Sequence, residues 1–508
     1  MAGSSVRQCV RDTTFHLIAL IVVSTLGPLQ FGFHLAELNA PQDVITCRKK
    51  SITTAALLAR LTGSSGDDAV SGWMPHCIPM SEAAFAFISS AFTVGGLIGA
   101  LNSGPFSSKR GRLPAMRATA LLFLAGSVVE TVAGSVPSMA LGRFISGIGA
   151  GGATVIVPLY ISEVAPPNER GLFGAMTQVA INIGILSTQT LGFFLSYGNV
   201  WRWTLGIGIC IALAQAVGLI AVPESPAWTA AHGDVTKAKR ILQRIRGSNA
   251  DIQEEVAAWD DLPSDGEEQG LLAQADDGSA IPTAAKSGQE HLGFFQVVRD
   301  RQYRPAIVAV VGSMFAQQFC GINSIIMYSV SLLEDLLPFS SGLLTILVSV
   351  LNLVMTIACS PLPDRLGRKT CLLISTIGQG VSSLALAFSI VFGFKGLSAI
   401  SVLFFVAFFA VGLGPVPFIL ASELVGQEAV GATQSWCLAG AYVATFIVAQ
   451  FFPILNTALN NTLGGHGWVY FVFAGLAAGS AVFISWRIPE TLGKKDLDDV
   501  WGRTRRLD

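Results

Sequence analysis

Charged side chains are scarce in this chain. Asp, Glu, Lys and Arg together make up 13% of the 508 residues, whereas hydrophobic residues make up 51%. One soluble core cannot bury that much apolar surface, so the composition favours a protein solvated by lipid. The formal net charge is −1. Nucleic acid is therefore not an expected partner, because a nucleic-acid-binding protein needs a basic face that displaces counterions.

Several enzyme signatures are missing as well. The sequence contains no His-Glu-x-x-His motif, no Gly-x-Ser-x-Gly elbow and no phosphate-binding loop with its lysine. The glycine-rich stretch 147–152 lies inside an apolar run and is better interpreted as a helix-packing surface. We therefore expect no enzyme, no metal and no cofactor.

Long apolar runs are abundant instead. About 20 apolar helical residues cross a bilayer core of roughly 30 Å, and the sequence predicts about twelve such spans. We expect an all-α membrane protein whose first run is retained as a span and is broken near Gly27, Pro28 and Gly32. The predicted spans are 15–37, 83–105, 114–136, 139–162, 172–196, 202–223, 305–333, 342–362, 370–393, 397–422, 430–455 and 467–487.

Short signals recur about half the chain apart. The pairs are Ser-Lys-Arg-Gly-Arg (108–112) with Asp-Arg-Leu-Gly-Arg-Lys (364–369), Ser162-Glu163 with Ser422-Glu423, and Pro223-Glu224 with Pro489-Glu490. Their offsets are 256, 260 and 266 residues (367 − 111, 423 − 163 and 489 − 223). This period predicts two parallel six-helix halves that move around a central site, as in a transporter. We divide the chain into a first half (1–223), a linker (224–304), a second half (305–489) and a tail (490–508).

Basic residues gather in the connections between spans two and three and between spans eight and nine. Cytoplasmic loops retain Lys and Arg, so the linker, the tail and both termini are predicted to be cytoplasmic. The loop 38–82 is an exception, because it carries Arg48 and Lys49 although it is placed outside. The linker is expected to begin with short amphipathic helices. Residues 251–290 contain eleven acidic residues and one lysine, which predicts a largely disordered segment that is available to a cytoplasmic protein.

Two covalent features are candidates in the outside loops. Cys47 and Cys77 are the two cysteines predicted to face outside, so a disulfide between them is open in an oxidising compartment. Asn460-Asn461-Thr462 is a glycosylation sequon before the last span. Either the plasma membrane or a vacuolar or other organellar membrane agrees with this topology.

The ordered motifs of the chain resemble those of the sugar porter family of the major facilitator superfamily. The resemblance covers nearly all of the chain outside 38–82 and 250–290. It implies the major facilitator fold and alternating-access transport of a hexose or related polyol. The motifs are Gly-Pro-Leu-Gln-Phe-Gly-Phe (27–33), Gly-Arg-Phe (142–144), Pro-Glu-Ser-Pro (223–226), Gln-Gln-Phe-Cys-Gly-Ile-Asn (317–323), Gly-Pro-Val-Pro (414–417) and Pro-Glu-Thr (489–491).

Neutral amides inside the apolar spans are the candidate sugar ligands. A buried amide is costly unless it pairs with another helix, water or ligand, and an uncharged polyol needs donors and acceptors of this kind. Bonding between helices explains such residues equally well from spacing alone. The family resemblance implies that the matching positions line the sugar site. They are Gln178, Gln317, Gln318, Asn323 and Asn352.

Tyr328 and Phe418 are candidates to pack against the face of a sugar ring. The chain departs from the glucose-facilitator pattern nearby, because Phe418 stands where Trp is common and Ala441-Tyr442 replaces an Asn-Trp pair. Because of these departures, the resemblance predicts a sugar as the class of substrate but does not specify glucose.

The basic loop motifs are also given a mechanical role by the resemblance. Ion pairs that join the inner ends of helices would favour the outward-open state and break when the inner side opens. Retaining the loops in the cytoplasm during insertion is a second role for the same residues. The predicted gate residues are Arg112, Glu163, Arg170, Arg368 and Glu423.

The first span leaves the coupling mechanism open. His34 occupies a position that is Asp in proton-coupled sugar porters and Asn in passive ones, and Glu37 follows three residues later. The pair could share a proton, with Arg143 as counter-charge, or His34 could be a neutral hydrogen-bonding partner. We favour facilitation and keep proton symport, with protons as a second partner, as the alternative. A non-transporting sugar sensor is a further alternative, although the tail is too short for a typical folded signalling domain.

Overall fold

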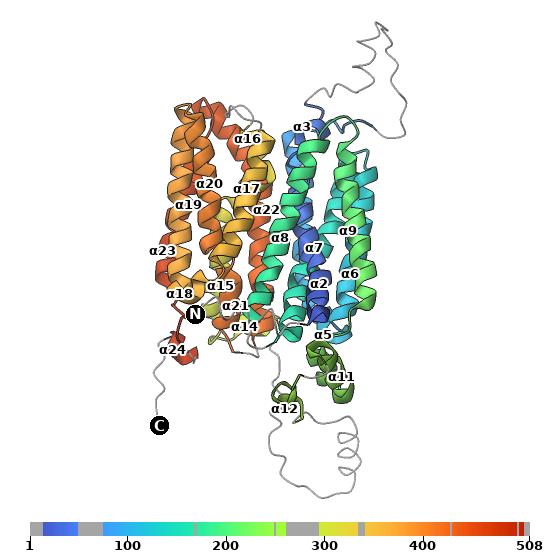
Figure 1. Ribbon diagram of the computed structural model, residues 1–508. Helices are drawn as coiled ribbons and strands as arrows, with labels where there is room; N and C mark the ends of the chain where they lie inside the picture. Colours follow the sequence, from blue (N-terminus) through green and yellow to red (C-terminus); the bar gives the residue numbers. More distant parts are fainter. Residues whose placement is uncertain are drawn as a thin grey trace, which may run out of the picture.

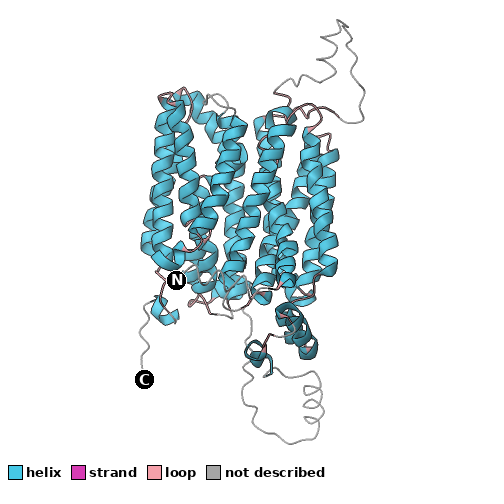
Figure 2. Cartoon of the chain, in the orientation of Figure 1, coloured by secondary structure: helices cyan, strands magenta, loops and turns pink. Residues whose placement is uncertain are grey.

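The computed structural model describes residues 14–48, 75–166, 170–247, 250–260, 294–333, 341–426, 429–494 and 497–501. These residues form helices joined by short connections, and no β-strand occurs among them (Figure 2). Within these described ranges, eleven helices are long and apolar enough to cross a membrane, and a bent pair raises the number to as many as twelve. The predicted all-α membrane fold is confirmed.

Six long helices make up the first bundle. Within it α5 packs along α7, α6 packs along both α7 and α9, and α2 packs along α8. These helices lie together on one side of the molecule (Figure 1). They are α2 (Phe15–Ala36), α5 (Glu82–Arg110), α6 (Arg112–Val132), α7 (Val136–Val164), α8 (Arg170–Leu195) and α9 (Trp201–Ala221).

The second bundle repeats this arrangement with two interrupted spans. One is the pair α15 and α16, which are bent by 44° at the break between them. The two bundles meet where α5 packs against α22 and α8 packs against α17. The helices are α15 (Arg304–Phe319), α16 (Ile322–Leu333), α17 (Ser341–Cys359), α19 (Arg368–Val391), α20 (Lys395–Val411), α21 (Val416–Glu423), α22 (Val430–Leu463) and α23 (Val469–Arg487).

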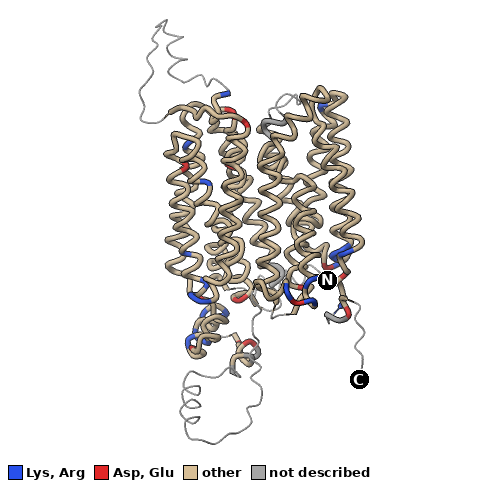
Figure 3. Tube along the Cα trace, turned by 180° about the vertical axis from the view of Figure 1, so that it is seen from behind, with Lys and Arg blue, Asp and Glu red and all other residues tan. Residues whose placement is uncertain are grey.

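Short helices lie at the ends of the bundles. Figure 1 shows α11, α12 and α24 beyond one end of both bundles. Blue Lys and Arg positions gather at that end in Figure 3, and we call it the basic face. The opposite end, which carries α3 and the Cys47–Cys77 disulfide, is called the disulfide face. The short helices are α3 (Gln42–Ile45), α10 (Pro226–Ala231), α11 (Val235–Arg246), α12 (Gln253–Asp260), α14 (Phe294–Arg299), α18 (Leu362–Leu366) and α24 (Leu497–Trp501).

The predicted break in the first span is wrong. Helix α2 runs without interruption from Phe15 to Ala36, with Pro28 inside it. Its glycines serve close packing instead, since a Cβ on Gly32 would lie 2.0 Å from the carbonyl oxygen of Ile181 in α8. Only a glycine lets the backbones of α2 and α8 approach this closely.

Several other boundaries also differ from the predicted spans. Helix α5 continues to Arg110 and α22 to Leu463, beyond the predicted ends at 105 and 455. The predicted span 397–422 is divided between α20 and α21, with residues 412–415 between them. Gly412 in this break packs closely on α19, since its Cβ would be 2.1 Å from the Cys371 oxygen. Apolar composition marks the part of a helix inside lipid, whereas the hydrogen-bonded helix itself extends into the polar interface.

The acidic part of the linker is not wholly irregular. Residues 253–260 form α12, and Glu255 of this helix binds Arg246 of α11 at 2.7 Å. The prediction of disorder is wrong for this helix, because the ion pair ties it to the end of α11. Residues 261–290 lie outside the described part of the chain.

Candidate functional site

A chain of neutral amides lies at the break between α15 and α16. The Nε2 group of Gln317 donates to the Leu413 carbonyl at 2.5 Å, and its Oε1 accepts from Gln318 at 2.8 Å. The Asn323 amide donates to Gln318 Oε1 at 2.6 Å and to Thr445 Oγ1 at 3.2 Å. Gln317, Gln318 and Asn323 are therefore brought together, and their bonds link α15 and α16 to α22 and to the break before α21.

A second group of amides joins the two bundles. The Asn182 amide of α8 donates to Thr356 Oγ1 of α17 at 2.8 Å, and Asn352 Nδ2 donates to Asn182 Oδ1 at 3.3 Å. Gln178 lies one turn from Asn182 and donates to the same oxygen at 3.4 Å. Asn352 Oδ1 is buried without a hydrogen-bond partner. An acceptor in this state is available to a ligand hydroxyl. Sequence analysis missed Asn182, although it is one helical turn from Gln178.

Asn352 also lines a small cavity between α8, α16 and α17. Gln189, Thr345 and Ser349 supply its other polar walls, and isoleucine and valine side chains supply the rest. The cavity has room for about one water molecule. A molecule the size of a hexose does not fit this cavity in the state described here.

The two predicted aromatic residues make different contacts. The hydroxyl of Tyr328 donates to the Ala449 carbonyl at 2.8 Å, and its ring packs beside Phe85 and Phe452. Phe418 is half-buried in a cluster that includes Tyr442. Both rings are thus held between the bundles, Tyr328 from α16 and Phe418 from α21.

Hydrogen bonds close the gap between the bundles toward the disulfide face. The Ile326 carbonyl of α16 accepts from Asn39 at 2.9 Å and from Gln189 at 3.3 Å. Farther out, Glu82 accepts from Thr457 at 2.8 Å and pairs with Arg48 at 2.6 Å. The path from the amides to the disulfide face is crossed by these contacts in this state.

A buried charged cluster lies inside the first bundle, and we define it as His34, Glu37, Glu130 and Arg143. His34 Nδ1 is 2.9 Å from Glu37 Oε2, and Arg143 Nη1 is 2.6 Å from Glu37 Oε1. His34 Nδ1 also lies 3.8 Å from Glu130 Oε2. All four side chains are 0–1% exposed. The predicted trio His34, Glu37 and Arg143 is therefore in direct contact, on helices α2 and α7 and the turn that follows α2.

Glu130 is the member that sequence analysis missed. It comes from α6, and its Oε1 accepts from Ser146 of α7 at 2.5 Å, while Ser127 one turn earlier contacts His34 Nε2 at 3.2 Å. The Oε2 atoms of Glu37 and Glu130 both face His34 Nδ1, at 2.9 Å and 3.8 Å. A lone acid near the end of an apolar span gives no local signal of this contact.

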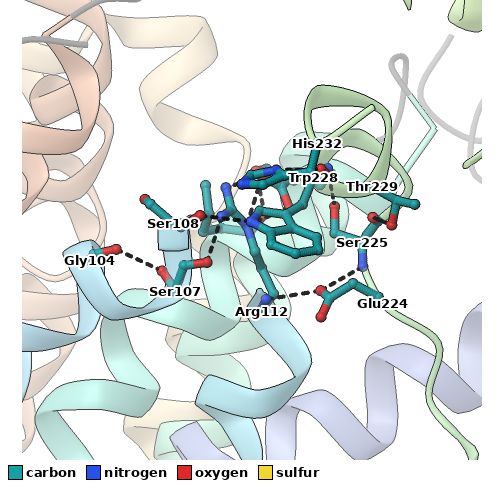
Figure 4. A network of polar contacts seen from close by, with 12 residues as sticks. Gly104, Ser107, Ser108, Arg112, Glu224, Ser225, Trp228, Thr229 and His232 are labelled. Carbon is teal, nitrogen blue, oxygen red and sulfur yellow. Dashed lines mark hydrogen bonds and ion pairs between the residues drawn. The ribbon is translucent and has the colours of Figure 1, made fainter. Parts of the chain in front are cut away.

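At the basic face the first bundle carries an ion-pair network, which is shown in part in Figure 4. Arg112 Nη2 lies 2.8 Å from Glu163 Oε1, and the Arg112 guanidinium also donates to the Ser107 carbonyl. Glu224 accepts from the backbone N–H of Arg112 at 2.9 Å and of Leu113 at 3.2 Å, which satisfies the N-terminus of α6. The network links α5, α6, α7 and the segment before α10.

The second bundle repeats the main contacts of this network. Arg368 Nη2 lies 2.8 Å from Glu423 Oε1, and Glu490 accepts from the backbone N–H of Arg368 at 2.8 Å and of Lys369 at 3.2 Å. Thr491 adds a bond to Glu423 at 2.5 Å. The recurring sequence signals thus mark one repeated arrangement. In each half an arginine pairs with one glutamate, and a second glutamate caps the next helix.

The remaining site predictions concern the disulfide, the glycosylation sequon and Arg170. Cys47 and Cys77 are joined by a disulfide, with 5.3 Å between their Cα atoms. Asn460 lies in the last turn of α22 and donates to Asn456 at 3.4 Å, so its glycosylation remains a prediction. Arg170 is the first residue of α8, and its side chain lies outside the described part of the structure.

Comparison with known proteins places these features in a family. The family model described as "Sugar (and other) transporter" matches residues 19–498. The probable metabolite transport protein YBR241C of Saccharomyces cerevisiae is 33% identical over 99% of this chain and 98% of its own length. The yeast vacuolar protein sorting-associated protein 73 is 31% identical over 96% of both chains.

The fold has a solved counterpart. A partially occluded, inward-open structure of the xylose transporter XylE from E. coli superposes with a TM-score of 0.71 at 23% identity, over 95% of this chain and 100% of that one. The predicted major facilitator fold is thereby confirmed. Members of this family are transporters and not enzymes. The match over almost the whole chain shows that this protein belongs to the sugar transporter family.

Proposed function

We propose that this protein carries a hexose or a related polyol across the membrane by alternating access. The observation that carries the proposal is the chain of neutral amides Gln317–Gln318–Asn323, which ends on Thr445. Amides supply donors and acceptors without net charge, which suits a polyol and disfavours an ionic substrate. A rat relative, 28% identical over 94% of this chain, is named a facilitated glucose transporter, which supports this substrate class.

Gln178 and Asn352 belong to the same proposal from the opposite bundle. Their shared partner Asn182 joins α8 to α17, so a sugar that binds between the bundles replaces bonds that now run from helix to helix. Tyr328 and Phe418 would cover the apolar faces of the ring. Exchange of one set of neutral bonds for another costs little free energy, which suits a carrier that must release its substrate.

Proton symport is the second candidate, and the buried charged cluster favours it. With His34 neutral, two carboxylates and one guanidinium leave one negative charge in a site that water does not reach. A buried uncompensated charge is costly, and one proton removes it. The Oε2 atoms of Glu37 and Glu130 lie 2.9 Å and 3.8 Å from His34 Nδ1, and they are the acceptors that a shared proton would join. XylE, named as a proton:xylose symporter, shows that this fold accommodates coupling.

Sidedness follows from the charges, and we place the basic face in the cytosol. In this orientation both termini and the linker are cytoplasmic, and the arginine networks of Arg112 and Arg368 are inner gates. The name of the yeast vacuolar sorting relative makes a vacuolar membrane as suitable a location as the plasma membrane. The segment 251–290 would then be open to a cytoplasmic protein.

Uptake into proteoliposomes tests both candidates. Purified protein is given a panel of radiolabelled hexoses, pentoses and polyols, with lumenal pH recorded at the same time. Saturable uptake of a monosaccharide or polyol supports the transport proposal, and no uptake of any member would contradict it and leave a sensor in its place. Acidification of the lumen during uptake supports symport, whereas uptake at constant lumenal pH supports facilitation.

A further inference from the structure

A single tyrosine of the second bundle reaches into the first. Tyr442 of α22 is 5% exposed, and its hydroxyl lies 3.2 Å from Thr154 Oγ1 of α7. Its ring packs on α5, where a Cβ on Gly96 would come within 2.2 Å of the ring carbon Cε1. The Phe31 ring of α2 meets it edge-on, with 6.4 Å between the ring centroids. Tyr442 therefore contacts three helices of the opposite bundle.

The position of Tyr442 along the path is set by its neighbours on α22. Thr445, which accepts from Asn323 of the amide chain, lies almost one turn farther toward the disulfide face. Leu438, one turn toward the basic face, belongs with Tyr442 and Phe418 to one apolar cluster. At 1.5 Å per residue, Tyr442 lies about 18 Å from the basic-face end of α22. A molecule that leaves Asn323 and Thr445 for the basic face passes the level of this ring.

Separation of α5 from α22 at the level of Tyr442 would break this contact. Helices α5 and α22 form one of the two main interfaces between the bundles, and the Tyr442 ring fills the space that glycine leaves there. Opening requires the hydroxyl to leave Thr154 and the ring to leave the backbone of α5. The ring and its hydrogen bond can therefore stabilise only states in which α5 and α22 stay in contact at this level.

We propose that Tyr442 is the gate that closes the substrate path on the basic-face side. Its hydrogen bond to Thr154 and the packing of its ring on Gly96 stabilise the closed position. The inference rests on alternating access by the family and not on the identity of the sugar. It goes beyond the arginine networks, because Arg112–Glu163 and Arg368–Glu423 each join helices of one bundle, whereas Tyr442–Thr154 joins the two.

The test measures access to the site from the basic-face side. A Thr445→Cys reporter is introduced into a protein without its native free cysteines. Vesicles that expose the basic face are then treated with a membrane-impermeant maleimide, without sugar. Loss of one hydrogen bond is worth about 0.5–1.5 kcal/mol, which corresponds to a labelling rate about two- to tenfold higher in Tyr442→Phe. Tyr442→Ala, which also removes the ring, should raise the rate further.

Two further variants distinguish a gating role of Tyr442 from a merely structural one. Thr154→Val removes the same bond from the other bundle, so it should raise the rate as much as Tyr442→Phe, and the double variant should raise it no further. Tyr470→Phe removes a hydroxyl from another buried tyrosine, in α23, and should leave the rate unchanged. Equal labelling in Tyr442→Phe, Tyr442→Ala and the unsubstituted reporter would overturn the proposal, as would an equal increase in Tyr470→Phe. Because no sugar is present, failure of the sugar proposal does not affect this result.

Discussion

Arg143 Nη1 lies 2.6 Å from Glu37 Oε1, and both side chains are almost fully shielded from solvent. The same nitrogen donates to the His34 carbonyl, and the guanidinium carbon lies 4.5 Å from the centroid of the Phe92 ring. One arginine thus joins the end of α2 to α5 and α7. Its charge is the only positive one in a cluster that contains two carboxyl groups.

Removal of that arginine should destabilise the protein strongly. Breaking a buried ion pair from one side typically costs about 3–5 kcal/mol, so Arg143→Ala should unfold at a clearly lower temperature in detergent. Arg48→Ala is the matched control, because Arg48 and Glu82 form a pair that is 43% and 44% exposed and should contribute about 0–1 kcal/mol. Similar unfolding temperatures for the two variants would show that the Arg143 pair adds no more than a surface pair.

Glu130 provides the sharpest test of coupling. Glu130→Gln keeps the size of the side chain and an acceptor for Ser146 but removes the carboxyl that can gain and lose a proton. If the cluster carries the coupled proton, this variant should retain sugar exchange at equal concentrations and lose lumenal acidification. Acidification at the wild-type rate would remove Glu130 from the proton path. His34→Ala serves as a second variant on the facing helix.

The contrast between Glu130 and Glu224 shows what the sequence could predict. The recurring signals around 111 and 367 predicted two related halves, and both halves carry the same arginine and capping carboxylate. Repetition is visible in a sequence because the same physical device is needed twice. Glu130 occurs once, and its partner His34 is 96 residues earlier (130 − 34), so only the packing of α2 against α6 brings them together.

Two further residues show the limits of local patterns. Gly32 and Pro28 suggested a broken first span, yet α2 is continuous. The prediction failed because a glycine at a helix contact and a glycine at a helix break look the same in the sequence. Tyr442 was noticed as a departure from the family pattern. Its packing on Gly96, 346 residues away (442 − 96), could be found only from the interface between the bundles.

The two capping glutamates should have equivalent effects. Glu224→Ala leaves the first N–H groups of α6 without a carboxylate acceptor, and Glu490→Ala does the same for α19. Each loss should cost about 0.5–2 kcal/mol of stability, as for other helix caps. Asp234→Ala is the control, because Asp234 caps only the short surface helix α11. Both glutamate variants should lower the unfolding temperature in detergent, whereas Asp234→Ala should hardly change it. Unequal losses for Glu224 and Glu490 would contradict their equivalence.

The amide chain should determine sugar affinity. Asn323→Ala leaves Gln318 Oε1 and Thr445 Oγ1 without their donor and removes one proposed sugar contact, so affinity should fall more than tenfold. Gln318→Ala interrupts the same chain and should have a similar effect. Asn102→Ala is the matched control, since Asn102 is an exposed amide that bonds only to the Ile98 carbonyl of its own helix. Sugar binding is measured by intrinsic tryptophan fluorescence and by the concentration dependence of uptake. Wild-type affinity in both Asn323→Ala and Gln318→Ala would move the substrate site away from α15 and α16, toward the Asn182–Asn352 group between α8 and α17.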